Sequence, residues 1–143
     1  MARKRTAKRK VDSSPAAKLR REKAKQRAID TRFKHHGTFM KAVEQAGLPT
    51  PIQEHKFHPT RKWRFDYSFH REGIQLAVEI NGGGSRGRHN TVSGATNDAE
   101  KMNEAAILGW TVLTFTVISI KDTEYVSQTL LAAYQRLEAA NGG

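Results

Sequence analysis

The first 36 residues of the chain contain too few apolar side chains to form a hydrophobic core. They hold 14 of its 25 Lys and Arg residues but only three of its 14 Asp and Glu residues, a local net charge of +11. Residues 37–143 hold 11 residues of each sign, so the first quarter of the sequence carries the whole formal charge of +11. Burial in such a segment cannot offset the entropy lost on ordering it. A folded domain is therefore expected only in residues 37–143.

The basic segment itself has two parts. Met1 to Pro15 is expected to be disordered, whereas Ala16 to about Phe33 is rich in residues that favour a helix. A positive charge concentrated in this way, with a pI near 10.3, is typical of nucleic-acid binding. The alternative is a solvated tail that aids solubility or targets the protein to a location within a cell. The cations expected to contact DNA here are Arg3, Lys4, Arg5, Lys8, Arg9, Lys10, Arg20 and Arg21.

Two absences in the sequence exclude whole classes of protein. The chain has no Cys, which excludes a disulfide framework, a Cys-based zinc site and a thiol nucleophile. It has no run of 18 apolar residues, and no apolar stretch follows the basic N-terminus, which argues against a membrane span and a secretory signal. A soluble intracellular protein without membrane partners is expected.

The pattern of residues 37–143 predicts an α/β fold with a mixed sheet flanked by helices. Helices are expected where apolar residues recur every three or four positions, and strands where aromatic and β-branched residues alternate or cluster. The two strands that flank the Asn97 helix should be parallel, because a helical crossover joins them. In chain order we expect a helix at Phe39–Ala46 capped by Thr38, strands at Pro51–Phe57, Trp63–Phe69 and Ile74–Ile80, a loop at Asn81–Gly94, a helix at Asn97–Leu108, a strand at Trp110–Val117 and a helix from Asp122 or Thr123 to about Ala140.

A carboxylate interrupts the most apolar of these strands. Glu79 lies in the run LAVEI, and an unpaired buried carboxylate costs several kcal/mol unless a partner offsets the cost. Asp66 poses the same problem on the preceding strand, on the face opposite the alternating row of Trp63, Phe65, Tyr67 and Phe69. Two such carboxylates at neighbouring strand ends suit Mg²⁺ or Mn²⁺. The structural alternative is an edge carboxylate paired with Arg64 or Arg61.

A lysine on the following helix is a candidate third member of the site. Asp98, Lys101, Ala105 and Leu108 are spaced by three and four residues, which places them on one stripe that turns towards the sheet. Lys101 would then point to the carboxylates and could stabilise charge that develops on a phosphate. The alternative is a surface Asp–Lys pair, because Met102, Ala106 and Ile107 form a competing apolar stripe.

The ordered segments RKWRFDYSF, LAVEINGGG, GRH and DAEKMNEAAILGWTVLTFT resemble the PD-(D/E)XK nuclease superfamily. More closely, they resemble small phage and bacterial endonuclease-like proteins of the VRR-NUC, very-short-patch-repair and Holliday-junction-resolvase kind. The likeness covers about Phe39 to Val117. The resemblance implies a restriction-endonuclease-like core in which Asp66, Glu79 and the backbone carbonyl of Ile80 bind Mg²⁺, with Mn²⁺ able to substitute. Glu44 would be a further ligand from the first helix, and an exposed helix Glu is its equal alternative.

One position departs from the superfamily's pattern. The Lys that follows the Glu by two residues is Asn81 here, and the resemblance implies that Lys101 replaces it from the helix. Asn81 could still hydrogen-bond a water molecule. His89 could carry a proton or contact the scissile phosphate, and a merely hydrogen-bonding loop His is the alternative. Further phosphate contacts are expected from Arg61, Lys62, Arg64, Arg86 and Arg88.

These observations predict a Mg²⁺-dependent endodeoxyribonuclease that selects DNA by structure, such as a junction resolvase or a recombination and repair nuclease. A resolvase would act as a homodimer, because two symmetric cuts need two sites. The resemblance places it in the cytoplasm of a bacterial or phage-infected cell, at the nucleoid. The first alternative is a non-catalytic DNA- or RNA-binding protein on a decayed nuclease fold, favoured by Asn81. A basic ribosome-associated protein explains the tail but not Glu79.

Overall fold

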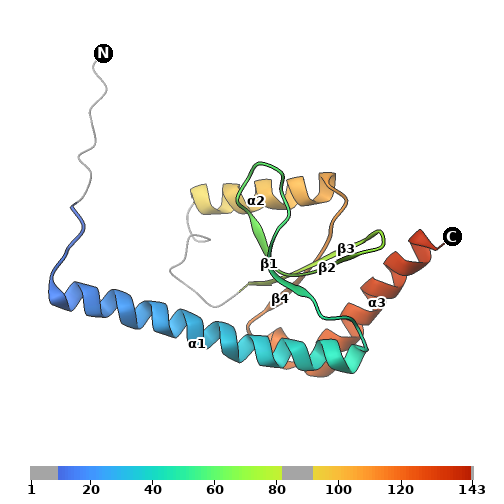
Figure 1. Ribbon diagram of the computed structural model, residues 1–143, viewed down its shortest axis with the longest axis horizontal. Coiled ribbons are helices and arrows are strands. Elements are labelled where there is room, and N and C mark those ends of the chain that lie inside the picture. The colour runs from blue at the N-terminus through green and yellow to red at the C-terminus, as the bar shows by residue number, and fades with distance from the viewer. Residues whose placement is uncertain (1–9, 82–91, 143) are drawn as a thin grey trace, which may run out of the picture. The chain divides into compact units, whose positions relative to one another are not determined.

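The computed structural model describes residues 10–81 and 92–142 of the chain. The chain separates into two units, Met1–Lys34 and His35–Gly143, and helix α1 (Pro15–Ala46) contributes to both. Among the described residues, no helix is both long and apolar enough to cross a membrane. The other elements, drawn in Figure 1, are β1 (Ile52–Lys56), β2 (Arg64–Arg71), β3 (Ile74–Asn81), α2 (Val92–Ile107), β4 (Thr111–Thr116), the 3₁₀ turn η2 (Ser119–Lys121) and α3 (Thr123–Asn141).

The strands form one mixed sheet in the order β1-β2-β3-β4. The first three strands are antiparallel neighbours, and β3 pairs with β4 in parallel, with Glu79 opposite Thr114. The helix between β3 and β4 is the crossover that makes a parallel pair feasible. The predicted mixed α/β sheet and its parallel pair are therefore confirmed.

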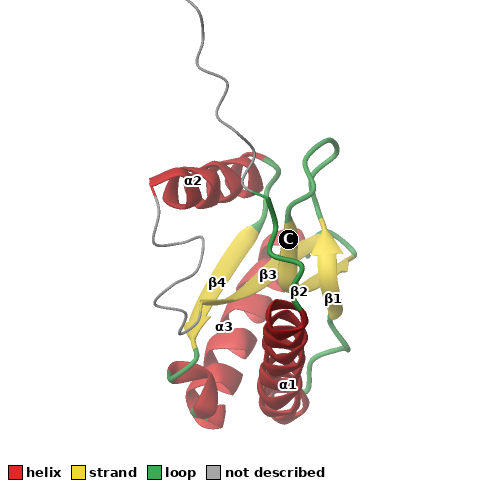
Figure 2. Cartoon of the chain, turned by 90° about the vertical axis from the view of Figure 1, so that its left-hand side faces the viewer, coloured by secondary structure: helices red, strands yellow, loops and turns green. Residues whose placement is uncertain are grey.

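Helices cover both faces of the sheet (Figure 2). One face packs on α3 and on the part of α1 from His35 onward, through a core that includes Phe39, Leu76 and Leu130. The other face packs on α2 through a smaller cluster of Phe65, Ala77, Ala105 and Trp110. Because Lys101 lies one turn before Ala105 on α2, the second face is the one that concerns the site.

The break expected before Thr38 is wrong, because α1 runs without interruption through Gly37. A glycine inside a helix costs roughly 1 kcal/mol relative to Ala, and the burial of Phe39, Ala42 and Val43 in the core offsets this. Thr38 is therefore a mid-helix residue and not a cap. The helix ends as expected at Gly47, whose φ of 68° lies in the left-handed region that favours glycine.

Two further details of the prediction are corrected. Phe65 does not share a face with Tyr67 and Phe69, but packs in the α2 cluster with Ala77 and Trp110. The pairing of β1 with β2 keeps one register on both sides of Glu54, which stands opposite Asp66 and has a φ of 50°. The distortion of β1 therefore coincides with the point where the alternation of β2 changes.

The loop expected at Asn81–Gly94 is also too long at its C-terminal end. Helix α2 begins at Val92, five residues before the expected start. Its first turn has one large apolar residue, Val92, which is exposed, followed by Ser93, Gly94 and Ala95, so no apolar periodicity indicates a helix there. The end of the helix could be predicted, because a glycine, Gly109, follows the last turn. In the structure Gly109 has a φ of 86°, in the left-handed region that favours glycine.

The start of α3 gives a first testable prediction. The Asp122 side chain accepts a hydrogen bond from the backbone N–H of Tyr125 at 3.0 Å, as an N-cap does. Asp122→Ala should lower the free energy of unfolding by about 1 kcal/mol, measured by urea denaturation. Asp122→Asn keeps the acceptor and should lose less than half of that. Equal losses in both variants would show that charge, and not the cap, is what stabilises the helix.

Candidate functional site

Asp66 and Glu79 lie side by side where the start of β2 meets the end of β3. The Oδ2 atom of Asp66 accepts a hydrogen bond from the backbone N–H of Ile80 at 2.7 Å. The regular pairing of the two strands begins at Tyr67 and Val78. The Asp66 carboxylate therefore takes up a backbone donor at the point where the ladder is distorted, and this bond holds it beside Glu79.

Lys101 reaches the pair from α2. Its Nζ atom donates a hydrogen bond to Oε1 of Glu79, and the two side chains are only 15% and 13% exposed. Nζ also lies 5.6 Å from the centroid of the Phe65 ring. Of the predicted stripe, Lys101 and Ala105 turn towards the sheet, whereas Leu108 is exposed. Ala106 and Ile107 of the competing stripe are exposed as well.

The electrostatics of the pair are those of a charge held out of water. Burial raises the pKa of Glu79 to about 7, and Asp66 adds to this while Lys101 opposes it. A group that titrates near neutral pH gains from any further cation placed beside it. Near neutral pH the Glu79 carboxyl therefore exchanges a proton, and a cation bound beside it would favour the ionised form.

The oxygen atoms at this point suit a hard divalent cation. Mg²⁺ typically binds one or two protein carboxylates and completes its shell with water and substrate oxygens. Asp66 and Glu79 supply two such carboxyl groups: Asp66 accepts Ile80 N–H, Glu79 accepts Lys101, and a side-chain hydrogen bond joins the two, which a metal bound by both would replace. Among residues 10–81 and 92–142, however, no set of three or more His, Asp or Glu side chains could hold a metal ion.

Glu44 is accordingly not a third carboxylate of this site. Its side chain is exposed on α1, next to Val43, which packs on the opposite face of the sheet from α2. The sequence could not separate the two readings of Glu44, because a carboxylate on the exposed side of a helix has the same local pattern in both. Asn81 is the last residue of β3, exposed and opposite Thr116.

The cations predicted to contact phosphate fall into three groups. Arg61, Lys62 and Arg64 are exposed around the turn between β1 and β2, and Lys10, Arg20 and Arg21 are exposed in the N-terminal unit. Arg61 pairs with Glu100 at 3.5 Å and lies over the Trp63 ring at 4.1 Å, so it is not the partner of either carboxylate. The remaining predicted residues lie outside the described ranges: Arg3, Lys4, Arg5, Lys8, Arg9, Arg86, Arg88 and His89.

The turn between β1 and β2 positions α2, and the sequence did not indicate this. His58 Nδ1 accepts the backbone N–H groups of Thr60 and Arg61, so its ring proton is on Nε2 and is donated to Glu104 at 3.1 Å. Trp63 Nε1 donates to Asn97 at 3.2 Å. These contacts hold two turns of α2 against the sheet, and Lys101 lies between them.

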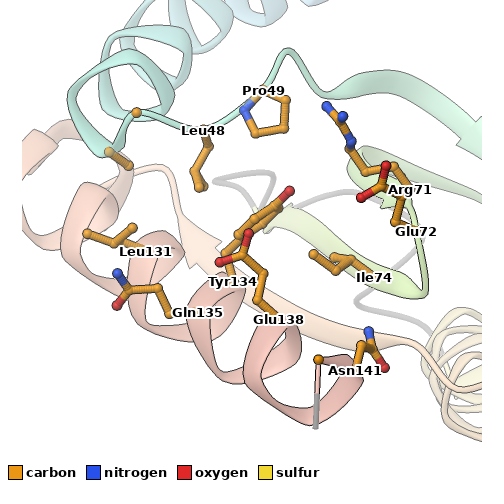
Figure 3. Close-up of a pocket in the computed structure, with 13 residues that line it drawn as sticks. Leu48, Pro49, Arg71, Glu72, Ile74, Leu131, Tyr134, Gln135, Glu138 and Asn141 are labelled. Atoms are coloured by element: carbon orange, nitrogen blue, oxygen red, sulfur yellow. The ribbon is translucent and has the colours of Figure 1, made fainter.

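A hollow of about 590 Å³ lies at the other end of β3. Arg71 at the end of β2, Glu72 of the turn that follows, and Tyr134 and Glu138 of α3 line it (Figure 3). Its lining mixes both signs of charge and includes Ile74, the first residue of β3. It is therefore separate from the carboxylate pair and contributes nothing to it.

Comparisons with protein-family models, curated proteins and solved structures found no match for this chain. The geometry of Asp66, Glu79 and Lys101 is therefore the observation that bears on function.

Proposed function

We propose that this protein is a Mg²⁺-dependent endodeoxyribonuclease with a restriction-endonuclease-like core. The observation that supports it best is the convergence of Asp66, Glu79 and Lys101 from three separate elements on one half-buried point of the sheet. A purely structural role would cost less with apolar side chains, because two carboxyl groups and a lysine are here taken partly out of water.

Each residue of the site has a task in phosphodiester hydrolysis. Asp66 and Glu79 would hold Mg²⁺, which supplies charge neutralisation at the phosphate and lowers the pKa of its water. Lys101 lies beside them, where its ammonium group can stabilise the negative charge that grows on the phosphate oxygens. Asn81, exposed at the end of β3, can orient a water molecule through its amide. His89 is proposed as a proton carrier from the sequence alone.

The partner and substrate follow from charge. The basic N-terminal unit would supply attraction to DNA phosphates that does not depend on sequence. Binding that does not depend on sequence fits an enzyme that selects branched or damaged DNA by its structure. Such an enzyme would act at the nucleoid in the cytoplasm. It would be a homodimer if it resolves junctions.

Lys101 gives the direct test of this function. Lys101→Met keeps the length of the side chain but removes its charge, and nicking of supercoiled plasmid in Mg²⁺ should fall by a factor of about 10². Lys101→Arg should retain part of the activity. Lys121→Met, a change of the same kind at an exposed position on η2, is the control and should cleave as the unmodified chain does.

Two results would reject the proposal. The first is equal nicking in Mg²⁺ and in EDTA by the unmodified chain. Such a result would mean either a contaminating nuclease or no nuclease activity at all. The second is full Mg²⁺-dependent activity in Lys101→Met. Circular dichroism on each variant separates loss of chemistry from loss of fold.

The second candidate is a DNA-binding protein without catalysis, and one observation favours it. The Lys101–Glu79 pair already satisfies part of the buried charge, as a structural ion pair would. The presence of Asn81 in place of a lysine agrees with this reading. Such a protein would bind plasmid at all Mg²⁺ concentrations and never nick it.

A further inference from the structure

The N-terminal part of α1 carries its positive charge in two rows. Lys18, Arg21 and Lys25 form one row and Arg20, Lys23 and Arg27 form the other, each with spacings of three and four residues. Residues three and four apart lie above one another on a helix. All six side chains are exposed.

The two rows flank one face of the helix. At ~100° per residue, the rows lie roughly 160° apart, and Ala24 and Ala28 fall between them. Both alanines are exposed. The acidic Glu22 and the apolar Leu19 lie on the opposite side, so among residues 18–28 the alanine face carries no negative charge. From Lys18 to Ala28 the face is therefore a smooth strip with a border of cations along each edge. At its N-terminal end Ala17, on the same stripe, is buried, and Asp12 contacts one arginine of each row.

These dimensions match one groove of double-stranded DNA. A helix with its side chains is ~10–12 Å across, and the major groove is ~12 Å wide with a phosphate strand along each side. Small side chains let a helix approach the base edges closely, while long cations on both sides reach the two strands. We propose that residues 18–28 bind in the major groove of duplex DNA, with Ala24 and Ala28 facing the bases and one row of cations on each phosphate strand.

Other polyanions fit this helix less well. The major groove of double-stranded RNA is too deep and narrow to admit a helix. A single strand, or the outer surface of a duplex, offers one line of phosphates and would engage one row only. Arg20 and Arg21 both contact Asp12 in the structure, but these contacts are exposed and weak, so phosphates can replace them.

The proposal rests on the proposed function only in taking DNA as the partner, and binding can be measured without cleavage. The experiment uses the full chain in EDTA, with fluorescence anisotropy of a labelled duplex of about 20 base pairs, roughly two helical turns, read over a series of salt concentrations. Two triple variants are compared, Lys18→Gln/Arg21→Gln/Lys25→Gln and Arg20→Gln/Lys23→Gln/Arg27→Gln. Each removes three phosphate contacts, so each should reduce the slope of log affinity against log salt by roughly 3.

A pair of single variants tests the face between the rows. Ala24→Leu keeps helix propensity but fills the groove-facing strip, and should weaken binding to the duplex by about tenfold. Gln26→Leu introduces the same side chain on the other side of the helix and should bind as the unmodified chain does.

The outcomes are distinct. A reduced slope in only one triple variant means that the helix lies along the outside of the duplex and overturns the proposal, as does equal affinity for a double-stranded RNA of the same length. Equal weakening by Ala24→Leu and Gln26→Leu also overturns it. If the chain binds DNA through both rows but does not nick it in Mg²⁺, the proposal for residues 18–28 stands and the proposed nuclease function is wrong.

Discussion

The Asp66→Asn and Glu79→Gln variants are each expected to lose Mg²⁺-dependent cleavage by a factor of about 10³ or more, with DNA binding in EDTA unchanged. Both carboxylates would be metal ligands, and metal-ion stabilisation of a transition state is worth several kcal/mol, or about tenfold in rate for each 1.4 kcal/mol. The amide that replaces each carboxylate removes the charge and most of the affinity for a hard cation. The measurement is the initial rate of plasmid nicking at saturating Mg²⁺.

These two substitutions are chosen because the structure shows how the fold survives them. In Asp66→Asn the amide oxygen of the new side chain would still accept the backbone N–H of Ile80, and in Glu79→Gln it would still accept Lys101. Glu138→Gln, a change at an exposed carboxylate on α3, is the matched control and should cleave normally. Retention of more than a tenth of the activity in both variants would remove Asp66 and Glu79 from the catalytic site.

The sequence predicted the central strands and the crossover because their signals are local. The apolar run of β3, the clustered β-branched residues of β4 and the glycine after α2 each lie within a few neighbouring residues. The misplaced elements depended on longer-range effects. Gly37 looks like a helix breaker until Phe39 and Val43 are seen packed on the sheet, and Phe65 changes face where the neighbouring strand is distorted at Glu54.

The same distinction holds for the site. Glu79 could be predicted from the sequence because a carboxylate inside an apolar strand needs a partner to offset the cost of its burial. Lys101 could be predicted because its spacing from Ala105 places both residues on one face of α2. The contacts that hold α2 in place were not visible. His58 and Glu104 are 46 residues apart, and Trp63 and Asn97 are 34 apart. Alone, Trp63 is typical of an aromatic strand residue, and the other three are typical of surface polar residues. Contacts between distant polar residues leave no periodic pattern, so only the structure reveals them.

The raised pKa of Glu79 predicts how stability depends on pH. The pKa of this carboxyl is about 7 in the folded protein, against 4.5 in the unfolded chain, so the folded state holds the proton more tightly. Its contribution is present below pH 4.5 and is lost as the pH rises through 7. The shift corresponds to about 3 kcal/mol, which the unmodified chain should lose between about pH 5 and pH 8 relative to Glu79→Gln.

The comparison with Glu79→Gln is what isolates this group. Burial and the neighbouring His70 lower the pKa of His55, which makes stability rise with pH through the same range, but this contribution is common to both proteins. Urea denaturation at about pH 5 and pH 8 gives the four free energies of unfolding. If the difference in unfolding free energy between the unmodified chain and Glu79→Gln is the same at both pH values, the pKa of Glu79 is not raised on folding. Lys101 would then offset the cost of burying the Glu79 carboxylate.

Magnesium then separates the two candidate functions through the same measurement. At about pH 8 the ionised pair should bind Mg²⁺ and raise the unfolding free energy of the unmodified chain, because a ligand that binds only the folded state stabilises it. Glu79→Gln and Asp66→Asn should gain about 1 kcal/mol less at a Mg²⁺ concentration roughly ten times the dissociation constant, where occupancy is worth about 1.4 kcal/mol. An equal increase in all three proteins would mean that the Glu79–Lys101 pair has a structural role. It would then favour the second candidate, a DNA-binding protein without catalysis.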